Sequence, residues 1–126
     1  MTVVLVALGA AVGAPLRYYT DRAVQTRHDS VFPWGTLTVN VIGSLLFGVL
    51  VGAAAVEGLP PAVVTGAGVG FCGALTTYST FGYETVRLAE SGSRLYALGN
   101  VLLSLAAGLG AAWAGLGLAT AIWSAA

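Results

Sequence analysis

Four long apolar stretches, separated by short polar connections, dominate the pattern of side chains along this chain. Each is close to the roughly 20 residues that an α-helix needs to cross the hydrocarbon core of a bilayer. The pattern therefore predicts an all-α membrane protein with four transmembrane helices in a single domain, residues 1–126. The stretches run from Thr2 to Leu16 with helical continuation to Val24, from Gly35 to Val56, from Pro61 towards Leu88, and from Leu95 to Ile122.

The composition is that of a chain whose surface faces lipid. Of 126 residues, 57% are hydrophobic and only 8% are charged, whereas soluble domains carry about 25% charged residues. The net charge of zero gives no reason to expect a nucleic-acid partner. Cys72 is the single cysteine, so an intrachain disulfide is excluded.

Glycines and hydroxyl residues interrupt the third apolar stretch at about Gly73–Ser79, where the middle of the bilayer is expected. These residue types favour backbone arrangements other than a helix. Non-helical backbone at that depth persists only where it is buried in protein or lines a water-filled path. Alternatively, the hydroxyls bond back to the preceding turn and merely bend the helix. We favour a break in the third helix, because broken helices are a recurrent device for ion sites.

Uncharged polar residues fall on helical faces of the second and fourth stretches. Asn40 lies one turn from Thr36 and from Ser44, while Asn100 and Ser104 share a face. A buried asparagine can simply hydrogen-bond a neighbouring helix, and for Asn100 this interpretation stays open beside a functional one. Together with the hydroxyl-rich interruption, these residues offer donors to an ion that must shed its water.

Three motifs resemble those of the Fluc (CrcB) fluoride channels: Gly-Ala-Pro-Leu-Arg-Tyr at 13–18, Gly-Thr-Leu-Thr-Val-Asn at 35–40, and Gly-Phe-Cys-Gly-Ala-Leu-Thr-Thr-Tyr-Ser-Thr-Phe at 70–81. The resemblance covers the whole chain. It implies a passive fluoride-specific channel, not an enzyme, which exports toxic fluoride from the cytoplasm and confers fluoride resistance. It also implies a multi-pass protein of the bacterial inner membrane that forms an antiparallel dimer with two pores.

The same resemblance implies roles for individual residues in a fluoride pore. Asn40 matches the family's pore-lining asparagine, and Phe81 matches an aromatic residue whose ring edge faces fluoride. Tyr78 stands where the family more often has phenylalanine, and it keeps a ring with an electropositive edge. Thr80 and Ser104 resemble members of a hydroxyl track beside the pore.

Two further expectations concern cations and the entrance to the pore. By resemblance, the backbone carbonyls of Gly73 and Thr76 hold a structural sodium ion at the dimer centre, which is not transported. Carbonyl oxygens suit such a hard cation. Arg17 lies at the end of a stretch, where it either draws anions into a vestibule or extends to the lipid interface.

The distribution of arginine complicates the choice of partner in the bilayer. All five basic residues fall on or near the first and third connections, and the positive-inside rule then predicts one fixed orientation. An antiparallel homodimer instead needs a chain with little bias. The partner is therefore either a second copy or an oppositely inserted, related chain. The arginines are at positions 17, 22, 27, 87 and 94.

Other functional classes fit the sequence less well. A small multidrug-type exporter with dual topology also uses four short helices, but it needs a membrane carboxylate for proton exchange. Glu84 is the one candidate, and it lies beyond the interruption. A scaffold subunit needs no hydroxyl-rich break. An enzyme is disfavoured because His28 has no nucleophile or carboxylate arranged around it and no metal-ligand cluster is evident.

Overall fold

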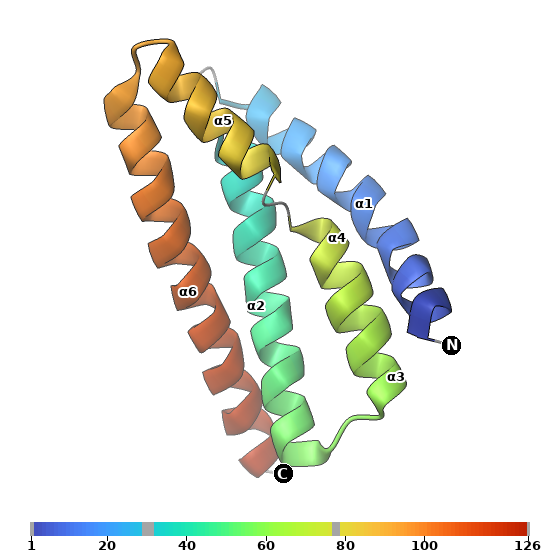
Figure 1. The fold of residues 1–126 in the computed structure, drawn as a ribbon. Coiled ribbons are helices and arrows are strands. Elements are labelled where there is room, and N and C mark those ends of the chain that lie inside the picture. Colours follow the sequence, from blue (N-terminus) through green and yellow to red (C-terminus); the bar gives the residue numbers. More distant parts are fainter. Residues whose placement is uncertain (1, 29–31, 77–78, 126) are drawn as a thin grey trace.

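The computed structural model describes residues 2–28, 32–76 and 79–125, and nearly all of them are helical (Figure 1). No strand occurs within these ranges, which confirms the prediction of an all-α chain. Among the described helices, α1, α2 and α6 are long and apolar enough to cross a membrane. The elements are α1 (Thr2–Thr26), α2 (Trp34–Glu57), α3 (Pro61–Val63), η1 (Val64–Cys72), α4 (Gly73–Leu75), α5 (Ser79–Glu90) and α6 (Arg94–Ala125).

The third predicted stretch is divided among α3, η1, α4 and α5. Pro61 is the first residue of α3, where its missing N–H costs the helix nothing. Through η1 the backbone forms a π-helix, with hydrogen bonds that span five residues instead of four. Helical backbone then continues past Gly73 and ends at Leu75, and Thr76 is extended with φ −80° and ψ 160°. Gly73, where the interruption was expected to begin, is therefore helical, and residues 77–78 of the expected interruption lie outside the described part of the chain.

Small residues bring helix backbones into direct contact within this one chain. A Cβ atom on Gly9 of α1 would collide with the backbone carbonyl of Gly66 in η1, and one on Gly115 of α6 would collide with the carbonyl of Leu45 in α2. These contacts join α1 to η1 and α2 to α6, the two most extensive helix pairs. These small residues therefore act as packing positions between helices of a single subunit.

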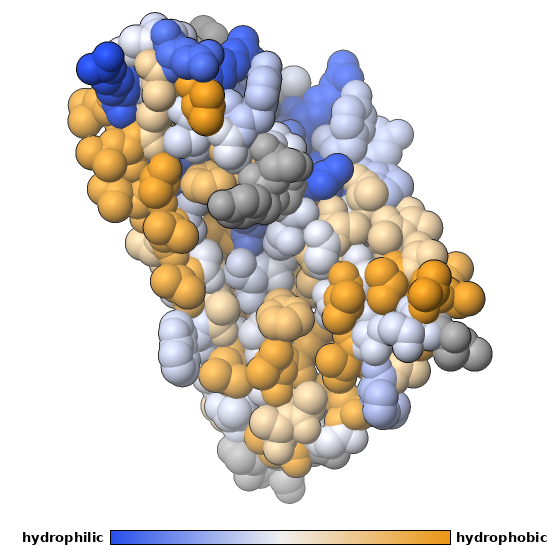
Figure 2. All heavy atoms as spheres, viewed as in Figure 1, coloured by the Kyte–Doolittle hydropathy of each residue, from blue (hydrophilic) through white to orange (hydrophobic). Residues whose placement is uncertain are grey.

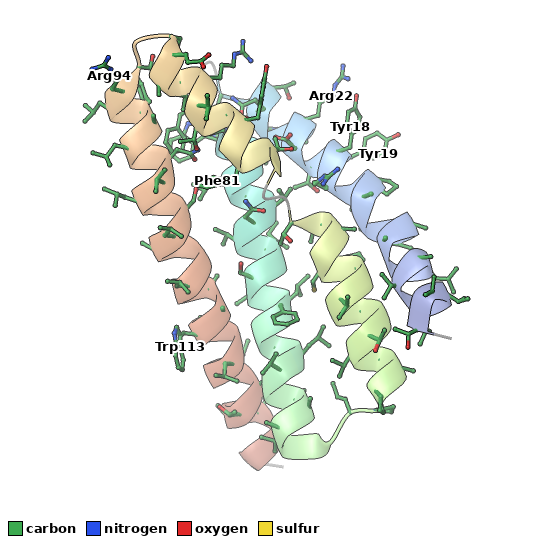
Figure 3. The ribbon with its side chains drawn as sticks, viewed as in Figure 1. Tyr18, Tyr19, Arg22, Phe81, Arg94 and Trp113 are labelled. Carbon is green, nitrogen blue, oxygen red and sulfur yellow. The ribbon has the colours of Figure 1, made fainter. Side chains whose placement is uncertain are left out.

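The charged and apolar side chains separate along the helix axes. Figure 2 shows hydrophilic side chains gathered at the end where α1 leads into α2 and α5 into α6, with an apolar surface below. Arg22 and Arg94 lie at the polar end in Figure 3, whereas Trp113 projects from the apolar part of α6. Leu105 and Leu109, which precede Trp113 on α6, are also exposed. Such a surface is suited to lipid or to another apolar chain.

Candidate functional site

A cavity of about 290 Å³ lies among α2, α5 and α6 beside the end of α4. It brings together Asn40, Phe81 and Ser104, three residues assigned to the pore from the sequence. Figure 3 shows Phe81 on the side of α5 that faces α6. The full lining is Asn40, Ser44, Thr76, Phe81, Ser104, Leu105 and Gly108. Its polar groups are therefore amide and hydroxyl, with an aromatic ring and no charged side chain.

A buried hydrogen-bond network leads away from this cavity. Ser104 Oγ donates to Asn100 Oδ1 at 3.2 Å, and Asn100 Nδ2 donates to Thr85 Oγ1 at 2.9 Å. Thr85 Oγ1 in turn donates to the backbone carbonyl of Phe81 at 2.8 Å. Asn100 is only 1% exposed. The network joins α5 to α6 and connects two residues of the cavity lining, so both interpretations of Asn100 remain compatible with its position.

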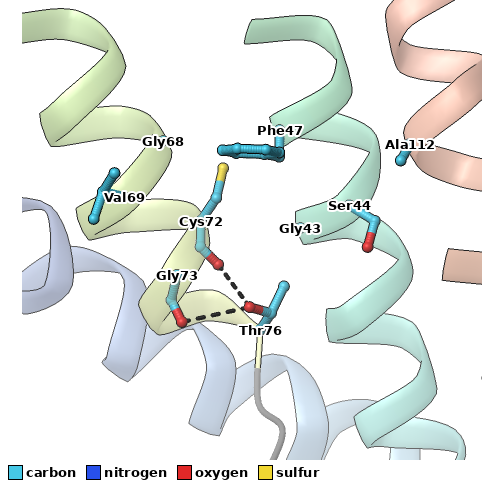
Figure 4. A pocket seen from close by; sticks show the side chains of 9 residues that line it. All are labelled: Gly43, Ser44, Phe47, Gly68, Val69, Cys72, Gly73, Thr76 and Ala112. Atoms are coloured by element: carbon cyan, nitrogen blue, oxygen red, sulfur yellow. Dashed lines mark hydrogen bonds between the residues drawn. The ribbon is translucent and has the colours of Figure 1, made fainter. Parts of the chain in front are cut away.

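A second cavity, of about 400 Å³, lies beside the end of α4 (Figure 4). Gly73 and Thr76, the residues assigned to sodium by resemblance, both line it. Thr76 Oγ1 donates to the Cys72 carbonyl at 3.0 Å and lies 3.4 Å from the Gly73 carbonyl oxygen. The complete lining is Gly43, Ser44, Phe47, Gly68, Val69, Cys72, Gly73, Thr76 and Ala112.

The chemistry of this second cavity is compatible with a hard cation. The carbonyls at the C-terminal end of a helix carry partial negative charge, and α4 ends at Leu75 beside the cavity. Carbonyl oxygens are suitable ligands for such ions. No group of three or more histidine, cysteine, aspartate or glutamate side chains that could hold a metal was found in the described ranges. The oxygen atoms that this cavity offers to a cation are therefore backbone carbonyls and the hydroxyls of Ser44 and Thr76.

A third cavity, of about 450 Å³, lies at the polar end of the chain between α1 and α5. Its lining is mostly polar, and Arg22 Nη1 donates to the Tyr18 hydroxyl at 2.9 Å within it. Arg17, assigned to a vestibule from the sequence, is not among the lining residues. The lining residues are Tyr18, Asp21, Arg22, Gln25, Thr26 and Glu84.

One predicted pore residue in the described ranges does not line the first cavity. Thr80 lies on α5, half-buried, and is not among the residues that line it. Tyr78 lies outside the described residues. Four residues in or near the cavity were not assigned a role from the sequence: Ser44, Leu105, Gly108 and Thr85. The helical spacing of the sequence could have identified Ser44 and Gly108. They follow Asn40 and Ser104 by one turn, on the same helix faces.

Comparison with known proteins identifies relatives along nearly the whole chain. Residues 4–116 match the model of a family described as "CrcB-like protein, Camphor Resistance (CrcB)". A protein of Frankia casuarinae, named fluoride-specific ion channel FluC 1, is 61% identical over 98% of this chain and 99% of its own length. The Streptomyces avermitilis protein of the same name is 57% identical over 98% of this chain and 100% of its own. A Natronomonas pharaonis protein, named FluC 2, is 48% identical over 97% of each.

Proposed function

Since this chain belongs to the CrcB-like family of fluoride-specific ion channels, we propose that it conducts fluoride passively across the cell membrane, out of the cytoplasm. Its relatives are named as ion channels, a class of protein that is not enzymatic. The observation that carries the proposal is the cavity in which Asn40, Phe81 and Ser104 meet.

The lining of that cavity is chemically suited to fluoride. A small, tightly hydrated anion enters a pore only if convergent donors replace its water. The Asn40 amide and the Ser104 hydroxyl are such donors, and the ring edge of Phe81 carries partial positive charge. In this proposal Thr80 adds a hydroxyl beside the pore, although it does not line this cavity. In this proposal Tyr78 supplies a second ring edge. The lining contains no lysine or arginine, so no fixed positive charge holds the ion too long for conduction.

We propose further that two chains pair in antiparallel fashion and form two pores. Apolar side chains of α2 beside the cavities support the pairing, because Leu45, Leu46 and Phe47 are between 36% and 44% exposed. The partner is a second copy, or an oppositely inserted related chain. Tagging each end of the chain and probing its sidedness in cells distinguishes the two, since a mixture of orientations for one chain supports the homodimer.

The centre of that dimer is the proposed place of a structural sodium ion. The carbonyls of Gly73 and Thr76 from each chain would hold it, and bound sodium would add a positive charge that both chains share. Gly73 begins α4, Thr76 directly follows its last residue, and both line the second cavity, which supports this assignment. Size-exclusion chromatography with sodium, and with a large organic cation in its place, tests it. If the proportion of dimer is the same in sodium and in the organic cation, the result would count against the proposed sodium site.

The decisive experiment is fluoride efflux from liposomes that contain the purified chain alone, with chloride efflux as the control. Rapid efflux of fluoride and negligible efflux of chloride would support a selective channel made by one gene product. If fluoride is retained, the chain is co-expressed with related chains from the same genome and the assay is repeated. Retention in both preparations would contradict the proposed function.

A further inference from the structure

The direction of each hydrogen bond around Asn100 is fixed by the chemistry of its neighbours. Thr85 has one hydroxyl proton and gives it to the Phe81 carbonyl. Thr85 Oγ1 can therefore only accept from Asn100, which places the amide nitrogen of Asn100 towards α5. The amide oxygen must then face Ser104, which donates its own proton to it.

This direction determines what Ser104 presents to the cavity that it lines. A serine hydroxyl has one proton and two lone pairs, and the proton of Ser104 points at Asn100. The lone pairs are left to face the cavity, although an anion there requires a donor. To bind fluoride, the hydroxyl has to rotate away from Asn100. The buried amide oxygen, on a residue that is 1% exposed, then loses its donor.

We infer that Asn100 is a positioning residue that competes with the permeating anion for the Ser104 proton. The inference rests on the proposed fluoride channel and goes beyond it, because it gives a residue outside the cavity lining control over how tightly the ion is held. Conduction requires that binding be favourable enough for entry and weak enough for exit. By holding the Ser104 proton, Asn100 weakens the contact between Ser104 and the anion, and so favours exit of the anion from the cavity.

A purely structural Asn100, which only ties α6 to α5, makes a different prediction. Its loss would reduce the number of assembled channels and hence the maximal efflux rate. It would leave the fluoride concentration for half-maximal efflux unchanged. Competition for the Ser104 proton instead changes that concentration, and only while Ser104 is present.

The test is a double-mutant cycle with Asn100→Leu and Ser104→Ala, read as fluoride efflux over a range of fluoride concentrations. Asn100→Leu should lower the half-saturating concentration about fivefold, the equivalent of about one hydrogen bond. In the Ser104→Ala background it should change nothing further. An unchanged half-saturating concentration in Asn100→Leu, or an equal shift with and without Ser104, would overturn the inference.

Thr85→Val is the second variant, in case Asn100→Leu does not assemble. It keeps Asn100 but frees the amide to turn its nitrogen towards Ser104, so the half-saturating concentration should again fall. Thr38→Val is the matched control, since the Thr38 hydroxyl also bonds a carbonyl four residues earlier at 2.8 Å. If the half-saturating concentration fell in both Thr85→Val and Thr38→Val, or in neither of them, competition for the Ser104 proton would be refuted. A wild-type chain that moves no fluoride, either alone or co-expressed with related chains, would overturn the proposed function itself, which is a distinct result.

Discussion

Thr36 donates a hydrogen bond from Oγ1 to Oε1 of Glu84, and so joins α2 to α5 across 48 positions of sequence. Thr36 is 1% exposed, so its hydroxyl has little access to water as an alternative partner. Asn40 follows Thr36 by one turn on α2, and Phe81 precedes Glu84 by nearly one turn on α5. The bond therefore helps to fix the distance between two residues that line the same cavity.

Thr36→Val should destabilise the folded chain by about 1 to 3 kcal/mol, because a half-buried carboxyl loses its donor. Chemical unfolding of the detergent-solubilised protein measures the effect. Thr38→Val is the control, since the Thr38 hydroxyl bonds only its own helix, at Trp34. Equal unfolding free energies for the two variants would show that the bond to Glu84 contributes nothing specific.

Gly9→Ala should disrupt the packing of α1 against η1. The new methyl group meets the backbone of Gly66 and Phe71, which cannot move as a flexible side chain can. Overpacking of this kind costs about 1 to 3 kcal/mol. Thermal unfolding monitored by circular dichroism measures it. Gly117→Ala is the matched control, because a Cβ atom there meets open space. A Gly9→Ala chain as stable as that control would contradict the close approach.

Phe81→Ile should lower the fluoride efflux rate about tenfold, if the ring edge contributes about 1 to 1.5 kcal/mol to passage of the ion. Isoleucine keeps the apolar bulk and removes the electropositive edge. Tyr83→Ile serves as the control, because Tyr83 is 66% exposed on the same helix. Chromatography should show that both variants assemble as the wild type does. Unchanged efflux in an assembled Phe81→Ile chain would remove the aromatic role.

Asn40→Asp should abolish fluoride efflux, because a carboxylate in the cavity repels an anion and offers it no donor. Asn40→Ser, which is uncharged and keeps a hydroxyl donor, should retain part of the flux. Measuring both in liposomes, with dimer content as a check on assembly, separates repulsion from misfolding. An aspartate variant that conducts as well as the serine variant would place Asn40 away from the ion's path.

Much of the helical arrangement could be predicted from the sequence, because apolar residues at membrane length leave few alternatives. The described bounds of α2 and α6 differ by only a few residues from the predicted stretches. The π-helical backbone of η1 could not be foreseen, since valine and glycine are compatible with several helix types. The helical backbone of Gly73 could not be foreseen for a related reason: glycine favours other conformations but also tolerates a helix.

The candidate site was predictable only in part. Asn40 and Ser104 stand out as polar residues in apolar helices, and the structure brings them to one cavity. The link between Thr85 and Asn100 depends on how α5 lies against α6, which no local pattern encodes. The bond between Thr36 and Glu84 is similar, because it depends on a long-range arrangement and Glu84 alone looks like an ordinary residue near a helix end.

The wider turns of η1 make the site sensitive to the length of the chain as well as to its composition. A π-helical turn holds about one residue more than an α-helical turn. Deleting a single residue between Val64 and Cys72, with the winding of the chain otherwise unchanged, would rotate every later position by up to about 100°. Gly73 and Thr76 would then face a different neighbour, although neither had been substituted. The orientation of these two residues therefore depends on the number of residues in η1, and not only on which side chains it carries.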